Sequence, residues 1–230
     1  MGLLDLIFPK RCVVCSSLGT YLCENDRLKI KPTEQFCPVC LKAAIGGTTH
    51  PKCKTRYSLD GLVCLFQYSS PIKDLIGQLK YRFTTDLETT IIEETKKSKN
   101  LANHNFKQYF LVPIPVSSNK KRWRGFNQTE ILGRKIASLL GIDFDPNILI
   151  KTKQTKPQAT LPKKERLIEV TNSFDITKEA EVRSKNYLVF DDVWTTGATV
   201  REVTKVLKRK GAGNIWALIL ASSHKNYLSR

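Results

Sequence analysis

The sequence predicts an α/β protein in which a mostly parallel sheet is flanked by helices and preceded by a small metal-binding domain. Residues 187–190, 199–210 and 215–221 follow one another as an apolar strand, a helix and a second apolar strand, the order of a parallel crossover unit. Six of the seven cysteines precede residue 54, in a stretch with few long apolar runs. We therefore expect a metal-binding domain at residues 1–58 and an α/β domain at residues 59–230.

Apolar patterning predicts further elements of the second domain. Residues 62–68 and 110–116 are typical of buried strands, and prolines end the second of them. Residues 72–81 and 128–140 carry apolar side chains three and four positions apart, as helices packed on a sheet do. Gly141 stands where a helix C-cap is expected.

Basic side chains greatly outnumber acidic ones. The chain has 38 Lys and Arg against 21 Asp and Glu, a formal net charge of +17. Such an excess raises the concentration of polyanions at the surface and speeds their encounter. It favours a nucleic acid partner over a merely solvated lysine-rich surface, without distinguishing DNA from RNA.

The sequence also predicts a cytoplasmic protein without membrane insertion. No stretch approaches the ~20 apolar residues of a membrane span. The opening apolar run at residues 2–8 contains Asp5 and is too short for a signal-peptide core. Because disulfides are rare in the reducing cytoplasm, the cysteines are better explained as metal ligands.

The cysteines fall into pairs at metal-ligand spacing, and two such pairs close a tetrahedral zinc site. Sequential pairing predicts a first site of Cys12, Cys15, Cys23 and Asp26, and a second of Cys37, Cys40, His50 and Cys53. A cross-braced alternative joins Cys12, Cys15, Cys37 and Cys40 in one site, so one or two zinc ions are expected. Buried free thiols are the other alternative. With no open coordination position or general base recognisable nearby, we expect the zinc to be structural.

The segment from Tyr187 to Thr199 is typical of a phosphate and ribose site. An apolar strand ends in Asp191 and Asp192, a loop of small residues follows, and a helix begins. Such a loop offers backbone N–H groups to a phosphate, aided by the positive end of the helix dipole. The two carboxylates suit ribose hydroxyls, which need acceptors. The alternative is a strand, turn and helix with an Asx-type N-cap.

This segment resembles the phosphoribosyl pyrophosphate signature of type I phosphoribosyltransferases. The resemblance implies that Asp191 and Asp192 bind the ribose hydroxyls and that magnesium accompanies the pyrophosphate. It also implies a type I phosphoribosyltransferase-like sheet for the second domain. The residues implied for the 5-phosphate are Thr195, Thr196, Gly197, Ala198 and Thr199.

Further segments resemble the ComF family of competence-associated proteins. They are Val112-Pro113-Ile114-Pro115, Arg122-Trp123-Arg124-Gly125-Phe126-Asn127-Gln128 and Gln158-x2-Leu161-x4-Arg166-x5-Asn172-x-Phe174. Each N-terminal pair of metal ligands forms a zinc knuckle, a short turn between two ligands. These paired knuckles are similar to a double zinc ribbon and extend the resemblance over nearly the whole chain.

The ComF resemblance implies roles for basic residues on the pyrophosphate side. Arg122 and Arg124 are the local residues able to grip a diphosphate, a solvated turn being the alternative. The Lys-rich tract 151–171 is expected to be largely a mobile loop, and its residues 154–166 lie where phosphoribosyltransferases carry a loop that closes on the substrate. Its Lys163, Lys164 and Arg166 are expected to contact pyrophosphate or a nucleic acid strand.

The resemblance implies a protein of natural transformation and DNA uptake that binds phosphoribosyl pyrophosphate, or a related ribose phosphate, and handles single-stranded DNA. Implied partners are the competence machinery, such as a DNA-translocating helicase and a recombination mediator. One alternative is a phosphoribosyltransferase of nucleotide salvage or synthesis, for which no acceptor site or catalytic residue is recognisable. The other is a nucleic acid binder with a vestigial pocket.

Overall fold

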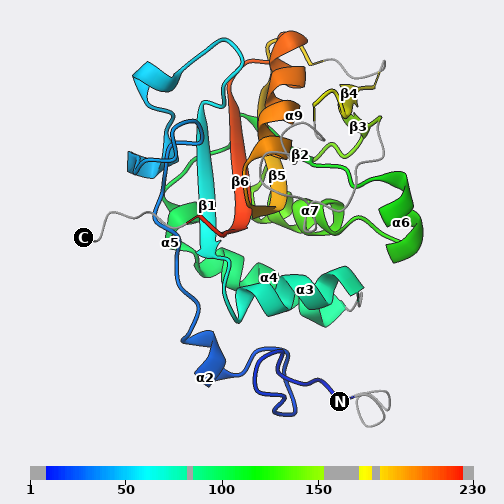
Figure 1. Cartoon of the computed structure of the whole chain (residues 1–230). Coiled ribbons are helices and arrows are strands. Elements are labelled where there is room, and N and C mark those ends of the chain that lie inside the picture. The colour runs from blue at the N-terminus through cyan, green and yellow to red at the C-terminus, as the bar shows by residue number, and fades with distance from the viewer. Residues whose placement is uncertain (1–8, 82–84, 153–170, 178–181, 225–230) are drawn as a thin grey trace.

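The computed structural model describes residues 9–81, 85–152, 171–177 and 182–224, arranged around a four-stranded parallel sheet (Figure 1). The strand order is β1-β6-β5-β2. The strands are β1 (Gly61–Gln67), β2 (Tyr109–Pro113), β5 (Asn186–Trp194) and β6 (Ile215–Ser222). These strands are apolar runs because both faces of the sheet are covered. The predicted α/β class is confirmed.

Helices cover one face of the sheet. They are α3 (Ile72–Tyr81), α4 (Thr85–Lys97), α5 (Lys99–Ala102) and α7 (Gln128–Leu140). Leu75 of α3 and Leu132 of α7 pack there with Leu188 and Phe190 of β5. The helices predicted at residues 72–81 and 128–140 are confirmed, and Gly141 ends α7 with a φ of +64° as expected. Helix α4 was not predicted, because its charged and threonine-rich sequence shows only a short apolar face.

The other face is covered by helix α9 (Ala198–Arg209), by an antiparallel strand pair and by part of the N-terminal region. The pair consists of β3 (Leu149–Lys151) and β4 (Phe174–Ile176). Val203 of α9 shares this core with Phe36 and Leu59 from the N-terminal region and with Cys64 of β1. Cys64 is therefore a core residue, as predicted.

The N-terminal region runs along the free edge of β1. Isolated bridges join Pro32 to Phe66 and Thr48 to Gly61. The side chain of Gln35 accepts a hydrogen bond from the Cys64 N–H at 3.1 Å and donates one to the Cys64 carbonyl at 2.8 Å. A sheet edge covered in this way cannot pair with another chain.

Four short helical segments complete the described chain. They are α2 (Glu24–Arg27), the 3-10 turns η1 (Ile45–Gly47) and η2 (Pro51–Cys53), and α6 (Ser118–Arg124). Helix α6 contains Arg122 and Arg124, for which a solvated turn was the alternative. Strand β5 continues to Trp194, so Asp191 and Asp192 lie within its last part and not beyond it. No helix among the described residues is long and apolar enough to cross a membrane.

Candidate functional site

The segment predicted to bind a ribose phosphate lies at the carboxyl end of β5. Residues 195–197 and the first two residues of α9, Ala198 and Thr199, are called the β5–α9 turn hereafter, and its Gly197 caps helix α9 with a φ of +73°. The Thr196 hydroxyl accepts a hydrogen bond from the Ala198 N–H at 3.3 Å. Since the first N–H groups of a helix have no partners within it, this turn presents donors and a positive dipole end beside the two acids.

The β5–α9 turn rests on Trp194, a residue to which sequence reasoning gave no role. Trp194 is 1% exposed. A Cβ atom at Gly197 would lie 2.2 Å from Cζ2 of the Trp194 ring. Glycine is therefore required at position 197 both by the positive φ and by the close approach of the indole.

Asp192 is held by two side chains from α3 and α7, the helices on the face of the sheet opposite α9. Its Oδ2 accepts from Lys80 Nζ at 2.8 Å and from Gln128 Nε2 at 3.2 Å. Arg124 Nη1 in turn donates to Gln128 Oε1 at 3.0 Å. The structure thus connects Arg124, predicted on the pyrophosphate side, to the acid predicted on the ribose side. The Arg122 guanidinium instead donates to Asn119 within the exposed part of α6.

The two adjacent acids differ in their protonation. Burial, together with the charge of Asp192, raises the pKa of Asp191 to about 8. Burial alone would also raise the pKa of Asp192, but the charge of Lys80 and the hydrogen bonds from Lys80 and Gln128 hold that pKa below its usual range. At neutral pH the pair therefore carries about one negative charge, which Lys80 offsets.

Lys80 is a site residue that sequence reasoning missed, although the sequence contains a signal. It lies four residues after Ile76 and eight after Ile72, on the apolar face of α3. A lysine on the buried face of an amphipathic helix needs a partner in the interior, and Asp192 supplies it. Lys163, Lys164 and Arg166, with the loop predicted around them, lie outside the described residues.

The N-terminal metal ligands form two clusters, each with its ligand atoms within 4.8 Å of one another. The first cluster is Cys12, Cys15, Cys23 and Asp26, and the second cluster is Cys37, Cys40, His50 and Cys53. This grouping follows the sequential pairing and not the cross-braced alternative. Each cluster can hold a metal ion.

The ligand atoms of both clusters are oriented by a further hydrogen bond. In the second cluster His50 Nε2 donates to the Ala43 carbonyl at 3.0 Å, which leaves Nδ1 to face Cys40 Sγ at 3.3 Å. In the first cluster Asp26 Oδ1 accepts from Lys29 Nζ at 2.7 Å, while Oδ2 lies 3.1 Å from Cys12 Sγ. Such contacts fix the ligand atom that faces a metal, so these residues fit a tetrahedral ion.

Curated proteins similar to this chain carry DNA-utilization and competence names. DNA utilization protein YhgH of Salmonella typhimurium is 26% identical over 224 residues, covering 93% of this chain and 98% of the relative. Competence protein F of Haemophilus influenzae is 26% identical, covering 73% of this chain and 76% of the relative. Competence protein ComFC of Streptococcus pneumoniae is 27% identical, covering 79% and 78%. The resemblance to the ComF family is confirmed.

A scan against protein-family models matches none. Solved structures similar to this ComF-like chain include adenine phosphoribosyltransferase from Saccharomyces cerevisiae, with 19% identity and a TM-score of 0.36, covering 60% of this chain and 70% of that one. A hypoxanthine phosphoribosyltransferase from Staphylococcus aureus has 14% identity and a TM-score of 0.37, covering 59% and 62%.

Proposed function

We propose that this chain is a ComF-type protein of natural transformation that binds phosphoribosyl pyrophosphate, or a related ribose phosphate, and handles single-stranded DNA in the cytoplasm. The observation that carries the proposal is the arrangement of Asp191 and Asp192 beside the β5–α9 turn, with Lys80 balancing their charge. The competence names of its relatives support the same role.

In this proposal each group of the site has one task. The ionised Asp192 accepts a hydrogen bond from a ribose hydroxyl, and the neutral Asp191 can both donate and accept. Backbone N–H groups of the β5–α9 turn, with Thr195 and Thr199, bind the 5-phosphate. Arg124 is proposed to contact the pyrophosphate. Magnesium, when bound, would reduce the negative charge of the pyrophosphate. Contacts with pyrophosphate or nucleic acid are also proposed for Arg122, Lys163, Lys164 and Arg166.

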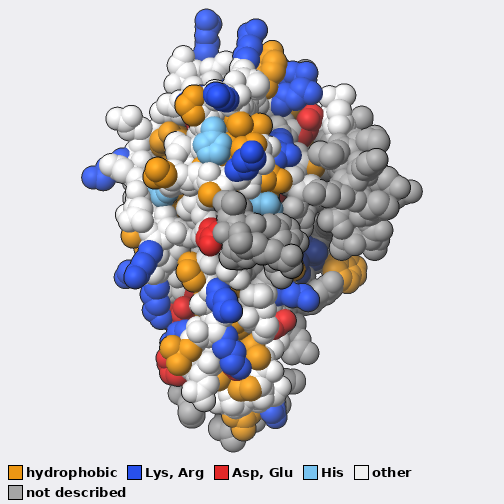
Figure 2. Space-filling view, turned by 60° about the vertical axis from the view of Figure 1, so that its left-hand side comes forward, with side chains coloured by type: hydrophobic (Ala, Val, Ile, Leu, Met, Phe, Trp, Pro, Cys, Tyr) orange, Lys and Arg blue, Asp and Glu red, His pale blue; other side chains and the backbone are white. Residues whose placement is uncertain are grey.

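The basic surface supports a single-stranded nucleic acid as partner. Figure 2 shows Lys and Arg side chains spread from the top of the molecule to its lower end, with fewer acidic ones among them. Trp123 is 69% exposed on α6, whose last turn carries Lys121, Arg122 and Arg124. An exposed indole among cations can stack on a base while the cations contact phosphates. A DNA-translocating helicase and other competence proteins are the proposed partners.

We further propose that the metal in both clusters is zinc and that its role is structural. Three thiolates with one imidazole or one carboxylate form a donor set that zinc accepts, and a small region with little core of its own gains folding energy from it. The division into a metal-binding domain at residues 1–58 and an α/β domain at residues 59–230 is part of this proposal.

Calorimetric titration of the metal-loaded protein with phosphoribosyl pyrophosphate and magnesium tests the ligand. We expect heat of binding that Asp192→Asn removes, because the ribose loses its charged acceptor. Asp143→Asn, which neutralises an exposed acid outside the site, is the matched control and should bind as the native protein does. Absence of heat with the native protein would reject the site as a phosphoribosyl pyrophosphate site.

Single-stranded DNA binding is tested separately, by fluorescence anisotropy of a labelled oligonucleotide. We expect affinity to fall with salt and Trp123→Ala to weaken binding, because stacking on the indole is lost. In the host, deletion of the gene should lower transformation by labelled plasmid. Undiminished transformation would remove the proposed biological role.

A second candidate function, phosphoribosyl transfer, is favoured by a cavity of about 420 Å³ beside the site. It is lined by Gln67, Tyr68 and Ser222 at the carboxyl ends of β1 and β6, and by Glu34 of the N-terminal region. Ser222 is the register partner of Trp194, so the cavity adjoins the end of β5. Ligands of open α/β sheets bind at this edge, where an acceptor molecule would meet the ribose.

Release of pyrophosphate from phosphoribosyl pyrophosphate with a panel of nucleobases distinguishes the two functions. Turnover with one base that Asp192→Asn abolishes would establish the enzyme. Binding without release across the panel would favour a ligand-binding role in DNA handling.

A further inference from the structure

The second metal cluster is joined directly to the helix that follows the β5–α9 turn. Pro38, inside the knuckle between Cys37 and Cys40, is buried, and its carbonyl accepts two hydrogen bonds from Arg201. They come from Nε at 3.0 Å and Nη2 at 2.6 Å. Arg201 lies in the first turn of α9, and its own N–H donates to the Gly197 carbonyl at 3.0 Å. Arg201 thus contacts the metal knuckle through its guanidinium and the turn through its backbone N–H.

An aromatic contact runs parallel to this hydrogen-bonded one. Phe36, which precedes Cys37, meets the ring of Trp194 edge-on with centroids 5.8 Å apart. The Arg201 guanidinium lies 5.5 Å from the same indole. Since the Trp194 ring packs against Gly197, the position of this ring determines where the backbone of the β5–α9 turn lies.

A third contact fastens the end of the knuckle. His224 Nε2 donates to the carbonyl of Leu41, the residue after Cys40, at 2.9 Å, and the His224 ring lies 4.8 Å from that of Phe36. The knuckle is thus held on several sides by groups at the carboxyl ends of β5 and β6.

We propose that the metal-bound second cluster sets the conformation of the β5–α9 turn, with Arg201 and Trp194 as the positioning residues, and that the first cluster does not. The expected effect on phosphoribosyl pyrophosphate affinity rests on the proposed function, whereas the expected effect on the conformation of the turn does not. A metal that fixes Cys37 and Cys40 also fixes the Pro38 carbonyl between them. When the metal is lost, that carbonyl moves, and a half-buried guanidinium loses its acceptor. The first turn of α9 and the indole beneath Gly197 then lose a common support.

The test compares two arginines, each of which fastens one cluster to the α/β core. Arg201→Met removes the donors to Pro38 but keeps an unbranched apolar chain over Trp194. Arg27→Met removes the ion pair between Arg27 next to the first cluster and Glu94 of α4, and is the matched control. Both variants are expected to retain two metal ions per chain, one for each cluster, by elemental analysis.

Two measurements are made on each variant and on the native protein. The first is hydrogen exchange of the amides at residues 194–201, read by mass spectrometry. The second is calorimetric affinity for phosphoribosyl pyrophosphate with magnesium. We expect Arg201→Met to speed exchange and to weaken binding about tenfold, the scale of one lost charged hydrogen-bonded contact. Arg27→Met should change neither.

Each outcome decides the proposal. Native exchange and native affinity in Arg201→Met overturn it, and so does equal weakening by both variants, which would indicate general destabilisation. Cys40→Ser, which removes a ligand of the second cluster, should reproduce the faster exchange. If that variant does not fold, Arg201→Met still decides. If the native protein binds no phosphoribosyl pyrophosphate, the proposed function fails while the exchange data still test the coupling.

Discussion

The two cysteine clusters share a local geometry but differ in what they contact. In each knuckle the residue after the second cysteine, Ser16 or Leu41, has a φ of +64°. Its N–H donates to the carbonyl of the first cysteine in both, at 2.9 Å. The first cluster, however, adjoins α4, whereas the second adjoins Trp194 and Arg201. The ligand motif therefore determines a metal site, and the place where that site packs determines what else it can influence.

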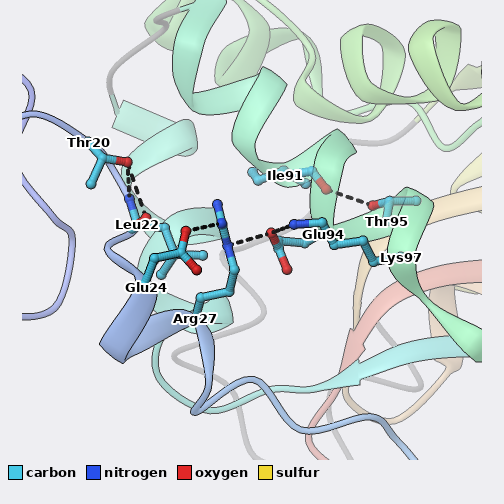
Figure 3. Close-up of polar contacts among 8 residues, drawn as sticks. All are labelled: Thr20, Leu22, Glu24, Arg27, Ile91, Glu94, Thr95 and Lys97. Atoms are coloured by element: carbon cyan, nitrogen blue, oxygen red, sulfur yellow. Dashed lines mark hydrogen bonds and ion pairs between the residues drawn. The ribbon is translucent and has the colours of Figure 1, made fainter.

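The attachments of the two clusters also differ chemically. Figure 3 shows Arg27 between Glu24 and Glu94, with Lys97 on the other side of Glu94. These are side-chain ion pairs, in which Glu24 and Lys97 are exposed whereas Glu94 is buried. The contact of Arg201 is to a buried backbone carbonyl, whose loss leaves a polar group unsatisfied. The first attachment ends on α4 and the second ends beside Gly197, so disturbance of the second cluster should reach the β5–α9 turn.

The largest effect is expected from removing one ligand from each cluster. Cys12→Ser and Cys37→Ser change buried cysteines at the first position of each knuckle. Both should lose one metal ion, and Cys37→Ser should lower the free energy of unfolding more, because Phe36 beside it belongs to the core of the sheet. Thermal unfolding with metal analysis measures this. A larger loss in Cys12→Ser would contradict the comparison.

A smaller effect is expected from two glycines with positive φ, one in each region. Gly19→Ala meets nothing within 4 Å, so it should cost only the strain of a left-handed residue, about 1–2 kcal/mol. Gly197→Ala adds a clash with Trp194 and should cost at least about 3 kcal/mol in all. Chemical denaturation of both variants measures the difference. Equal losses in the free energy of unfolding would show that the Trp194 ring can move away from a Cβ at position 197 without cost.

A third prediction concerns the pH dependence of stability that arises from Asp191. The pKa of Asp191 is raised from 3.8 to about 8, so the folded state retains a proton that the unfolded chain releases. This contribution to stability is fully present below pH 3.8 and is lost as pH rises toward 8. Asp191→Asn, neutral throughout, should therefore gain stability relative to the native protein as pH rises.

The measurement for Asp191 is the melting temperature of both proteins at pH 5 and pH 8. The advantage of Asp191→Asn should grow between them by at least about 2–4 °C, the shift that corresponds to 1 kcal/mol in a chain of this size. A constant difference would mean that Asp191 is already ionised at pH 5.

The smallest effect is expected in the rate of metal loss. The first cluster contains a carboxylate where the second has an imidazole, and zinc favours imidazole and thiolate ligands over carboxylate ones. A chelator should empty the first cluster sooner, and Asp26→Cys should slow that loss. A colorimetric zinc indicator follows the release, and faster release from the second cluster would reverse the expected order.

The sequence alone determined the features that depend on residues close together in the chain. Cysteine spacing predicted the knuckles, because each is closed by hydrogen bonds within a few residues, but it left a cross-braced grouping open until the structure placed the ligands in two sequential sets. The turn between β5 and α9 was predictable for the same reason, since strand, glycine and helix start are contiguous. The helical spacing of apolar residues in α3 and α7 predicted those two helices. Helix α4 was not predicted, because its sequence is rich in charged residues.

Only the tertiary structure decided which groups meet across the chain. Arg201 and Pro38 are 163 residues apart, and Gln128 and Asp192 are 64 apart. Neither spacing nor periodicity encodes such pairs, because they arise from the order in which parallel strands pack and from the helices laid on each face. For that reason the two clusters are alike as sequences, while only the second lies against the turn beside Asp191 and Asp192.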